Sequence, residues 1–324
     1  MGYEVEIGEV LDERFKITGL LNEGGMARVF RATDLNTRSE VAVKIPLMQF
    51  ESDPTFFRQF QREESIAASL DHPHVIRIIK PEARSRPYIV TELLDGRTLD
   101  SLMAGGLRLD LPSAVGLIIR LCDVLTYIHR QGVVHRDLKP GNIMCCADGT
   151  LRLFDFGLAI TPNQKQVAPS GLKGDLGTLV YMAPEQVRGK RADARTDVYA
   201  LGSILYEMAT GQRPFPMEDQ EESAMARTTG DPIAPRKLNP DLSPELEEII
   251  LRAIARDPEL RYPNCETFKH DLENPHAVGV TGLADRLTAP RPYRPLTSLA
   301  FKWLLFATIP LIAFALLLFL SRRH

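Results

Sequence analysis

The sequence is poor in cysteine and nearly balanced in charge. Its 324 residues include four cysteines, Cys122, Cys145, Cys146 and Cys265, and no two of them have C-x-x-C spacing. This argues against a disulfide framework or a zinc site, and we expect reduced, apolar cysteine side chains in a reducing compartment. The formal net charge of −3 provides no overall field that would attract nucleic acid.

The N-terminus lacks the marks of a targeting segment. Met1 to Val10 contain neither a basic start nor an apolar stretch, so no signal peptide is predicted. Glu6 stands where a myristoylation site that begins at Gly2 would carry a hydroxyl residue. With 44% hydrophobic and 25% charged residues, the composition is that of an ordinary globular protein with material for about two domains.

Two kinds of pattern divide the chain. The N-terminal part is rich in β-type runs, at Phe15 to Leu20, Val29 to Ala32, Val41 to Ile45, Val75 to Ile79 and Tyr88 to Glu92. One helix interrupts them, at about Pro54 to Leu70. After Asp95-Gly96, apolar residues recur at helical spacing from Val115 to Ile128, and Ser243-Pro244 has the form of a helix start. Strands first and helices afterwards predict an α+β fold with two lobes and a cleft between them.

Three motifs that follow Asp95-Gly96 contain residue types suited to catalysis. They are His135-Arg136-Asp137-Leu138-Lys139-Pro140-Gly141-Asn142, then Asp155-Phe156-Gly157, then Ala183-Pro184-Glu185. A hydroxyl that attacks ATP needs a proton acceptor, which Asp137 can supply. Magnesium ions need hard oxygen ligands, which Asn142 and Asp155 can supply. Lys139 lies where a cation can hold the γ-phosphate. The full match in this order excludes a chance run in a β-hairpin.

On these motifs the chain resembles the eukaryotic-like, or bacterial Hanks-type, serine/threonine protein kinases, over residues 10 to 273. The resemblance implies a kinase domain over 1–273, with a β-rich N-lobe at 10–94, a helical C-lobe at 95–273 and a hinge at Asp95-Gly96. It implies transfer of the ATP γ-phosphoryl group to Ser or Thr hydroxyls of proteins, with Mg²⁺ at Asn142 and Asp155, and autophosphorylation. Lys139 favours serine/threonine over tyrosine substrates. Thr178 matches the threonine that bridges Asp137 and Lys139.

The family's glycine-rich loop, G-x-G-x-x-G-x-V, is degenerate in this chain. Its place is taken by Leu21-Asn22-Glu23-Gly24-Gly25-Met26-Ala27-Arg28-Val29, in which only Gly24 falls in register. Asn22 replaces the first glycine, and asparagine tolerates positive φ better than most residues. Ala27 replaces the third glycine and still allows close backbone approach. A Gly-Gly hairpin turn would look the same in isolation, and we expect the departures to affect phosphate affinity more than fold.

The resemblance also implies the rest of the nucleotide site. Lys44 matches the strand lysine that holds the α- and β-phosphates, with Glu63 as its expected partner and Glu64 as the alternative. Glu92 to Leu94 would hold the adenine edge, and Thr91 would line the back wall. The positions expected around the nucleotide are Leu21, Asn22, Glu23, Gly24, Gly25, Met26, Ala27, Val29, Ala42, Lys44, Glu63, Thr91, Glu92 and Leu94.

Other family matches are expected to support this site. His135 and Phe156 should pack as buried members of the core. Asp197 resembles the buried aspartate that anchors the backbone of the catalytic loop, His135 to Asn142, and Glu185 with Arg261 resembles the buried ion pair of the C-lobe. Arg136 directly precedes Asp137, a pair that often accompanies control by phosphorylation of the activation segment, which lies between Asp155 and Ala183 in this chain. Ser170 is the phosphorylation site that we expect there.

A long apolar run near the C-terminus predicts a membrane anchor. Trp303 to Leu320 are apolar except for Thr308 and Pro310. A helix of this length spans about 27 Å, close to the ~30 Å hydrocarbon core. We expect a proline-containing linker at 274–298, a transmembrane helix at 299–320 and a short tail at 321–324, too short for an outer sensor domain. The alternative is a buried C-terminal helix. Flanking basic residues and the need for ATP place the kinase domain on the cytoplasmic side, at a bacterial inner membrane.

Two other functions compete with a membrane-tethered protein kinase. A pseudokinase scaffold would bind nucleotide or partners without phosphoryl transfer, and the degenerate glycine-rich loop is its one support. A kinase of small molecules would share the fold, but the Ala183-Pro184-Glu185 segment favours protein substrates. Tethering to a bilayer would also bring kinase copies together, so a homodimer is an expected partner beside protein substrates and the membrane.

Overall fold

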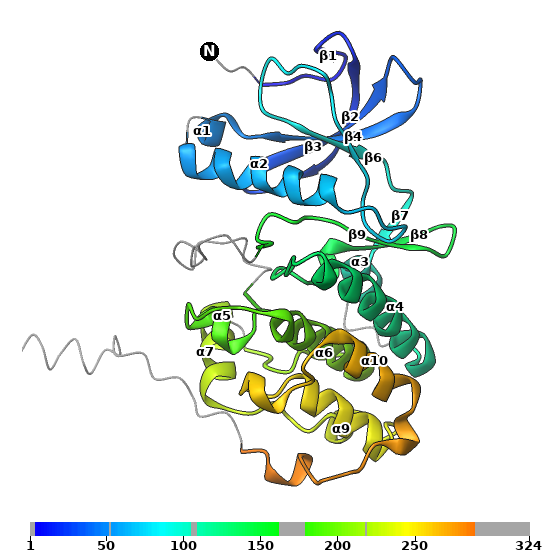
Figure 1. The fold of residues 1–324 in the computed structure, drawn as a ribbon, viewed down its shortest axis with the longest axis vertical. Coiled ribbons are helices and arrows are strands. Elements are labelled where there is room, and N and C mark those ends of the chain that lie inside the picture. Colours follow the sequence, from blue (N-terminus) through cyan, green and yellow to red (C-terminus); the bar gives the residue numbers. More distant parts are fainter. Residues whose placement is uncertain (1–3, 52, 105–108, 162–178, 218, 289–324) are drawn as a thin grey trace, which may run out of the picture.

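The computed structural model describes residues 4–51, 53–104, 109–161, 179–217 and 219–288. These residues form two lobes, a β-rich lobe at the top of Figure 1 and a helical lobe below it, as the sequence predicts. The segments expected at 299–320 and 321–324 lie outside the described residues, and so do Ser170 and Thr178.

The N-lobe is built on an antiparallel six-stranded sheet. Its order is β1 (Val10–Leu11), β2 (Phe15–Glu23), β3 (Ala27–Asp34), β4 (Glu40–Pro46), β6 (Ile89–Glu92) and β5 (Ile78–Ile79). Helices α1 (Met48–Glu51) and α2 (Pro54–Ser69) follow β4. On β4, Val41, Val43 and Ile45 are buried in the N-lobe core. Alternation along the strand therefore directs Ala42 and Lys44 to its other face.

The strand expected at Val75 to Ile79 is shorter than predicted. Only Ile78–Ile79 form β5, whereas Val75 makes an isolated parallel bridge with Leu153. The backbone N–H of Ile76 donates to Leu153 O at 3.0 Å. The first half of this apolar run thus pairs with the C-lobe rather than with the N-lobe sheet. The hydrophobic periodicity of the sequence does not predict such a long-range contact.

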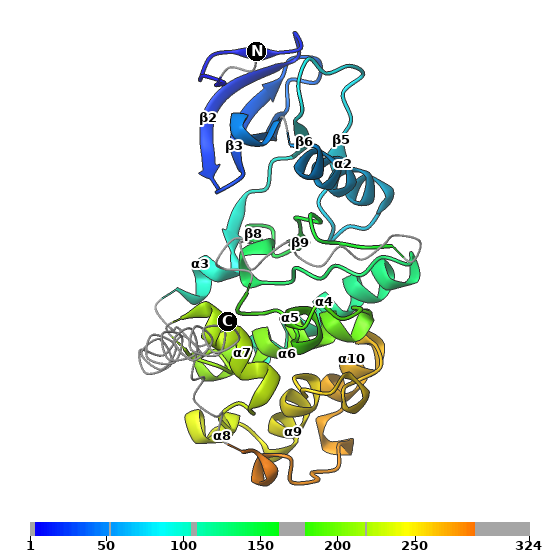
Figure 2. The same cartoon turned by 90° about the vertical axis from the view of Figure 1, so that its left-hand side faces the viewer.

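A small sheet lies at the junction of the lobes (Figure 2). It consists of β7 (Gly96–Thr98), β8 (Ile143–Cys146) and β9 (Leu151–Leu153). A Cβ atom on Gly96 would lie 2.3 Å from Cys145 O, so only glycine allows β7 to approach β8 this closely. The catalytic loop and the Asp155 loop flank β8 and β9 in the chain, so this sheet holds both at the junction of the lobes.

Helices account for most of the C-lobe. They are α3 (Leu99–Met103), α4 (Leu111–Arg130), α5 (Pro184–Val187), α6 (Ala194–Thr210), α7 (Gln220–Thr229), α8 (Pro235–Leu238), α9 (Pro244–Ala253) and α10 (Cys265–Glu273), with short 3₁₀ turns η1 (Pro140–Asn142), η2 (Pro258–Leu260), η3 (Pro275–Ala277) and η4 (Ala284–Arg286). Ser243 caps α9 as expected, since its Oγ accepts the Leu246 N–H at 3.1 Å. A Cβ on Gly202 of α6 would lie 2.7 Å from Ala253 Cβ, which explains the glycine where α6 meets α9.

Within the described residues, one helix is long and apolar enough to cross a membrane, namely α4, with a mean hydropathy of 1.6. It packs against α6 and α10, and its inner face belongs to the C-lobe core. A core helix of a globular lobe meets the same criterion, so α4 is a weak indication of a membrane protein.

The C-lobe packing continues past the boundary expected at residue 273. Val278, Leu283 and Leu287 lie against the C-lobe core. Thr288 donates to Asp231 Oδ2 from its backbone N–H at 3.1 Å and from its hydroxyl at 2.9 Å. Residues 274–288, which the sequence assigned to a linker, are therefore part of the C-lobe. The sequence signal was misleading because prolines break helices without preventing packing.

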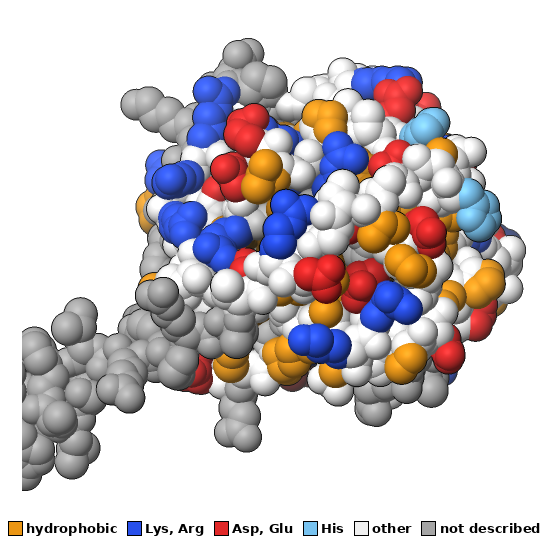
Figure 3. Space-filling model, turned by 90° about the horizontal axis from the view of Figure 1, so that it is seen from below, with side chains coloured by type: hydrophobic (Ala, Val, Ile, Leu, Met, Phe, Trp, Pro, Cys, Tyr) orange, Lys and Arg blue, Asp and Glu red, His pale blue; other side chains and the backbone are white. Residues whose placement is uncertain are grey.

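The C-lobe end of the molecule presents a mixed surface. In Figure 3, which views this end, hydrophobic side chains are scattered among acidic and basic ones. Such interspersed single apolar residues are normal on a water-facing protein surface.

Candidate active site

Lys44 brings two carboxylates together between the lobes. It lies on β4, whereas Glu63 belongs to α2 and Asp155 follows β9. Lys44 Nζ lies 2.6 Å from Glu63 Oε1 and 3.7 Å from Asp155 Oδ1. The structure thus pairs Lys44 with Glu63 rather than with Glu64, whose carboxylate binds Arg84 instead.

The charges of Lys44 and its two carboxylate partners are coupled, with attraction to the lysine opposed by repulsion between the carboxylates. Burial alone would lower the pKa of Lys44, but the Asp155 and Glu63 carboxylates outweigh it and raise that pKa above its usual value. Burial would likewise raise the pKa of Asp155, but the Lys44 and Lys139 cations hold it below its usual range. Burial dominates at Glu63 and raises its pKa, with Lys44 as a partial offset. The site therefore keeps a cationic Lys44 beside an ionised Asp155.

Contacts within the catalytic loop fix Asp137. Asn142 Nδ2 donates to Asp137 O at 2.9 Å and to Asp137 Oδ2 at 3.1 Å. Lys139 Nζ lies 3.6 Å from the same carboxylate oxygen. The Asn142 Nδ2 atom is occupied by its hydrogen bonds to Asp137. The Asn142 Oδ1 atom therefore remains to ligate a cation. Together with the Asp155 carboxylate, this donor set fits Mg²⁺, which binds a few protein oxygens and the oxygens of phosphates.

Asp197 on α6 anchors the backbone on which Asp137 stands, as expected. Its buried carboxylate accepts the backbone N–H groups of His135 and Arg136, each at 2.9 Å. Arg136 has a φ of 67°, a left-handed conformation that is costly for a residue with a side chain. The two hydrogen bonds hold the loop in this conformation.

His129 on α4 is a further partner of Asp197, one that the sequence analysis missed. Its Nε2 lies 2.7 Å from Asp197 Oδ2. Burial would lower the pKa of His129, but the hydrogen bond with Asp197 raises it to about 10. Burial would raise the pKa of Asp197, and His129 holds it below its usual value. A lone histidine at the end of a helix gives no signal of this pairing in the sequence.

The Asp155-Phe156-Gly157 motif has the tight geometry that its residue types require. Asp155 has a φ of 64°, and its Oδ1 accepts the Gly157 N–H at 3.3 Å. A Cβ on Gly157 would lie 3.3 Å from Asp155 Oδ1, which is a tight contact, so glycine eases the close approach of this carboxylate. Phe156 packs on His135, with ring centroids 4.9 Å apart and both side chains buried, as expected.

The glycine-rich loop is a short hairpin between β2 and β3. The Gly24 N–H donates to Ala27 O at 2.9 Å and closes the turn. Asn22 lies in β2, beside a register shift, and does not have positive φ. The rationale that asparagine replaces glycine for its tolerance of positive φ is therefore wrong here, because Asn22 is extended. Leu21 and Met26 are exposed beside this turn, and Glu23 pairs with Arg28.

Strand registers bring the residues expected around the base together. Ala42 pairs with Thr91, and Val29 with Lys44. Thr91 is half-buried, and its hydroxyl donates to Glu92 O at 3.1 Å. The Glu92 side chain accepts the Arg77 N–H at 2.9 Å. Gly25 lies in the β2–β3 turn, and Leu94 is half-buried just before β7.

Arg62 and Arg136 form a cationic pair beside the catalytic loop. Both guanidinium groups have buried nitrogens that lack a hydrogen-bond partner among the described residues. These are Nε and Nη2 of Arg62 and Nε of Arg136. Burial lowers the pKa of Arg62. Burial and the Arg62 charge lower that of Arg136, so the two groups repel each other. Such an arrangement favours an anion between them.

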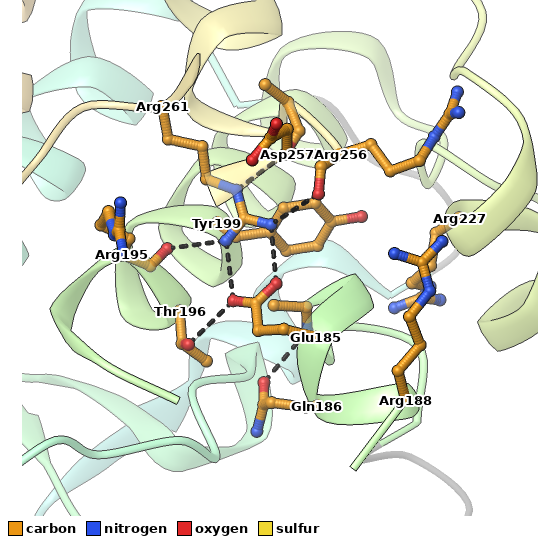
Figure 4. A network of polar contacts seen from close by, with 12 residues as sticks. Glu185, Gln186, Arg188, Arg195, Thr196, Tyr199, Arg227, Arg256, Asp257 and Arg261 are labelled. Carbon is orange, nitrogen blue, oxygen red and sulfur yellow. Dashed lines mark hydrogen bonds and ion pairs between the residues drawn. The ribbon is translucent and has the colours of Figure 1, made fainter. Parts of the chain in front are cut away.

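Below the site, Glu185 and Arg261 form the buried ion pair that was expected (Figure 4). The two guanidinium nitrogens Nη1 and Nη2 donate to Glu185 Oε1 and Oε2, each at 2.8 Å. Thr196 Oγ1 adds a hydrogen bond of 2.9 Å to Oε1, and the guanidinium lies over the Tyr199 ring. The pair fixes α5, at the end of the activation segment, to the C-lobe.

The model of one family, the protein kinase domain, matches residues 15–272. This chain belongs to the protein kinase family. It is 36% identical over 276 residues to serine/threonine-protein kinase PknB of Mycobacterium tuberculosis, covering 82% of this chain and 43% of that protein. It is 34% identical over 287 residues to a probable serine/threonine-protein kinase of Streptomyces coelicolor, covering 86% of this chain and 43% of the relative.

The chain thus spans less than half the length of these curated relatives. Among solved structures, it is similar to the kinase domain of Mycobacterium tuberculosis PknI, with a TM-score of 0.66 at 24% identity, over 84% of this chain and 100% of that one. At this identity the likeness shows the fold, which agrees with the two lobes described above.

Proposed function

We propose that this chain is a serine/threonine protein kinase that transfers the γ-phosphoryl group of ATP to Ser or Thr hydroxyls of proteins. The observation that carries the proposal is the meeting of groups from both lobes. Lys44 and Glu63 of the N-lobe lie in contact, and Lys44 Nζ lies 3.7 Å from Asp155 of the C-lobe. A phosphate chain held between Lys44 and Asp155 would lie between the lobes, the arrangement that phosphoryl transfer needs.

Each residue then has a role that follows from its contacts. Asp137 accepts the proton of the attacking hydroxyl, and Asn142 keeps its carboxylate in place. Lys139, close to the same carboxylate, contributes positive charge where the phosphoryl group transfers. Asp155 and Asn142 would hold Mg²⁺, which supplies charge neutralisation on the phosphate oxygens. Thr178 keeps its proposed bridging role, although it lies outside the described residues.

Transfer of labelled phosphate tests the proposal directly. The purified full chain, given γ-labelled ATP and Mg²⁺, should label itself or a general protein substrate on serine or threonine. Nucleotide binding without any transfer would support the pseudokinase scaffold instead. Label on small molecules alone, with no labelled protein, would favour a small-molecule kinase.

We also propose that phosphorylation of the activation segment, at Ser170, raises activity. Arg62 and Arg136 offer buried guanidinium nitrogens for a phosphate, which carries about −1.5 to −2 charges. Tyr181 is a poor alternative because its buried hydroxyl donates to Glu207 Oε2 at 2.5 Å. We expect phosphatase treatment to lower the activity of the wild type but not that of Ser170→Ala. Mass spectra of active kinase without phosphate between residues 158 and 177 would contradict this prediction.

A membrane anchor at 299–320 is the third part of the proposal, with the kinase domain on the cytoplasmic side and contacts between kinase copies favoured at the bilayer. Leu311→Arg combined with Leu316→Arg should move the chain from the membrane to the soluble fraction, since each arginine costs about 2.5–3.5 kcal/mol at a helix centre. Leu311→Ile with Leu316→Ile is the matched control and should stay in the membrane fraction. Wild-type chain found wholly in the soluble fraction would instead indicate a packed helix.

The structure refines how a soluble form should be made. Because Thr288 binds Asp231, the chain should be truncated after Thr288 rather than at residue 273. That form should keep wild-type turnover on a peptide.

A further inference from the structure

Helix α2 must be held in place for Lys44 to meet Glu63, and its apolar contacts reach the C-lobe and helix α1 rather than the core of the N-lobe sheet. Ile66 and Ala67 near its C-terminal end, and Leu70 just after it, belong to the hydrophobic cluster of the C-lobe. Among the described residues, no α2 side chain belongs to the cluster that fills the N-lobe sheet. Phe60 is buried and stacks on Phe56, which in turn packs on Phe50 of α1. Polar contacts therefore carry much of the attachment of α2 to the sheet.

Arg84, in the loop between β5 and β6, makes such a contact. Its Nη1 donates to Glu64 Oε2 at 2.8 Å, and its Nη2 donates to Glu64 Oε1. The side chains of Arg84 and Glu64 are 27% and 13% exposed, so this two-point ion pair is more shielded than an ordinary surface pair. Glu64 adjoins Glu63, so the pair acts next to the residue that binds Lys44.

The loop that carries Arg84 is itself tied to the first turn of the sheet. The Arg84 guanidinium lies 5.4 Å from the centre of the buried Tyr88 ring. The Tyr88 hydroxyl donates to Asp12 Oδ2 at 2.5 Å, and the Ser85 N–H donates to Asp12 Oδ1 at 3.0 Å. These contacts restrict the orientation of the Arg84 side chain. Less conformational entropy is therefore lost when Arg84 forms its ion pair with Glu64.

We propose that Arg84 is a positioning residue for phosphoryl transfer, which holds α2 through Glu64 so that Glu63 reaches Lys44. The inference rests on the proposed kinase activity. Arg84 does not touch the nucleotide site; it fixes the helix that does. Asp12 and Tyr88 support it from the sheet, and the interaction that it protects is the contact of 2.6 Å between Lys44 and Glu63.

Kinetics of the full chain with ATP and a peptide substrate test this role. Arg84→Ala should lower kcat about fivefold, within the range of coupling between residues in contact, while leaving the KM for peptide unchanged. Arg84→Lys should lie between Arg84→Ala and the wild type, since lysine cannot form the two-point contact. Arg31→Ala, which breaks an exposed N-lobe pair with Glu40 at 3.7 Å, is the matched control and should behave as the wild type.

A combination with Glu63→Gln separates positioning from a general loss of stability. If Arg84 acts through Glu63, then Arg84→Ala should change kcat less than about twofold in the Glu63→Gln background. Full multiplication of the two effects, or wild-type kcat in Arg84→Ala, would overturn the inference. A wild-type chain that transfers no phosphate would instead overturn the proposed function, so the two failures are distinguishable.

Discussion

Asp137→Asn should abolish nearly all phosphoryl transfer while leaving the fold and ATP binding intact. The substitution keeps the size of the side chain and removes only the proton acceptor, a contribution of about 10²–10⁴-fold to the rate in general-base catalysis. Asn142 can still donate to the backbone carbonyl of residue 137, as it does at 2.9 Å in the wild type. The loop stays anchored through Asp197, which binds the backbone of His135 and Arg136 rather than Asp137.

The measurement is labelled phosphate transfer, alongside nucleotide affinity and thermal unfolding of the same preparations. Asp148→Asn is the matched control. Asp148 lies in the exposed turn between β8 and β9, where its Oδ1 accepts the Thr150 N–H at 2.8 Å, and its replacement should leave turnover unchanged. If Asp137→Asn protein phosphorylates itself like the wild type, the role assigned to Asp137 is wrong.

The parts of the site that the sequence predicted best are those where neighbours in the chain are neighbours in space. Asp137, Lys139 and Asn142 lie within a single loop, so the motif alone implied the contacts that the structure contains. Lys44 and Glu63 lie in separate elements, so the local sequence could not predict their pairing. The match to the family's spacing favoured Glu63 over Glu64. The contact of 2.6 Å agrees with that choice, and the binding of Arg84 accounts for Glu64.

Other features depend on partners distant in the chain, and composition could not reveal them. His129 and Asp197 are 68 positions apart and meet only because α4 packs on α6. Val75 does not join the predicted strand because it forms a bridge with Leu153 instead. Asp231 and Thr288 are 57 positions apart, so the local sequence gives no sign of their contact. The prolines near the C-terminus therefore predicted a linker, although the chain there is packed. In each case a tertiary contact overrode a local tendency.

Arg261→Ala should destabilise the C-lobe by about 3–5 kcal/mol, because it leaves the Glu185 carboxylate buried without its countercharge. The Arg261 side chain is fully buried and that of Glu185 is 8% exposed, so water cannot replace the lost partner. Arg261 also donates from Nε to Ala255 O at 2.7 Å and from Nη1 to Arg195 O at 3.1 Å. For a lobe of this size, the expected fall in Tm is roughly 2–4 °C for each kcal/mol lost.

A double substitution distinguishes the loss of an ion pair from the loss of packing. Arg261→Met with Glu185→Leu removes both charges and keeps much of the volume, so it should recover part of the stability lost in Arg261→Ala. Arg130→Ala is the matched control, since its pair with Glu266 has 69% and 67% exposed side chains, and it should leave the unfolding midpoint nearly unchanged. An Arg261→Ala variant as stable as the wild type would show that Glu185 gains water or another partner. Activity should fall with stability in this series, because Glu185 lies in the first turn of α5, directly after the activation segment, and Gln186 beside it donates to Arg136 O at 2.8 Å. The ion pair thereby connects the C-lobe core to the backbone of the catalytic loop, so a defect far from the phosphates should still reach Asp137.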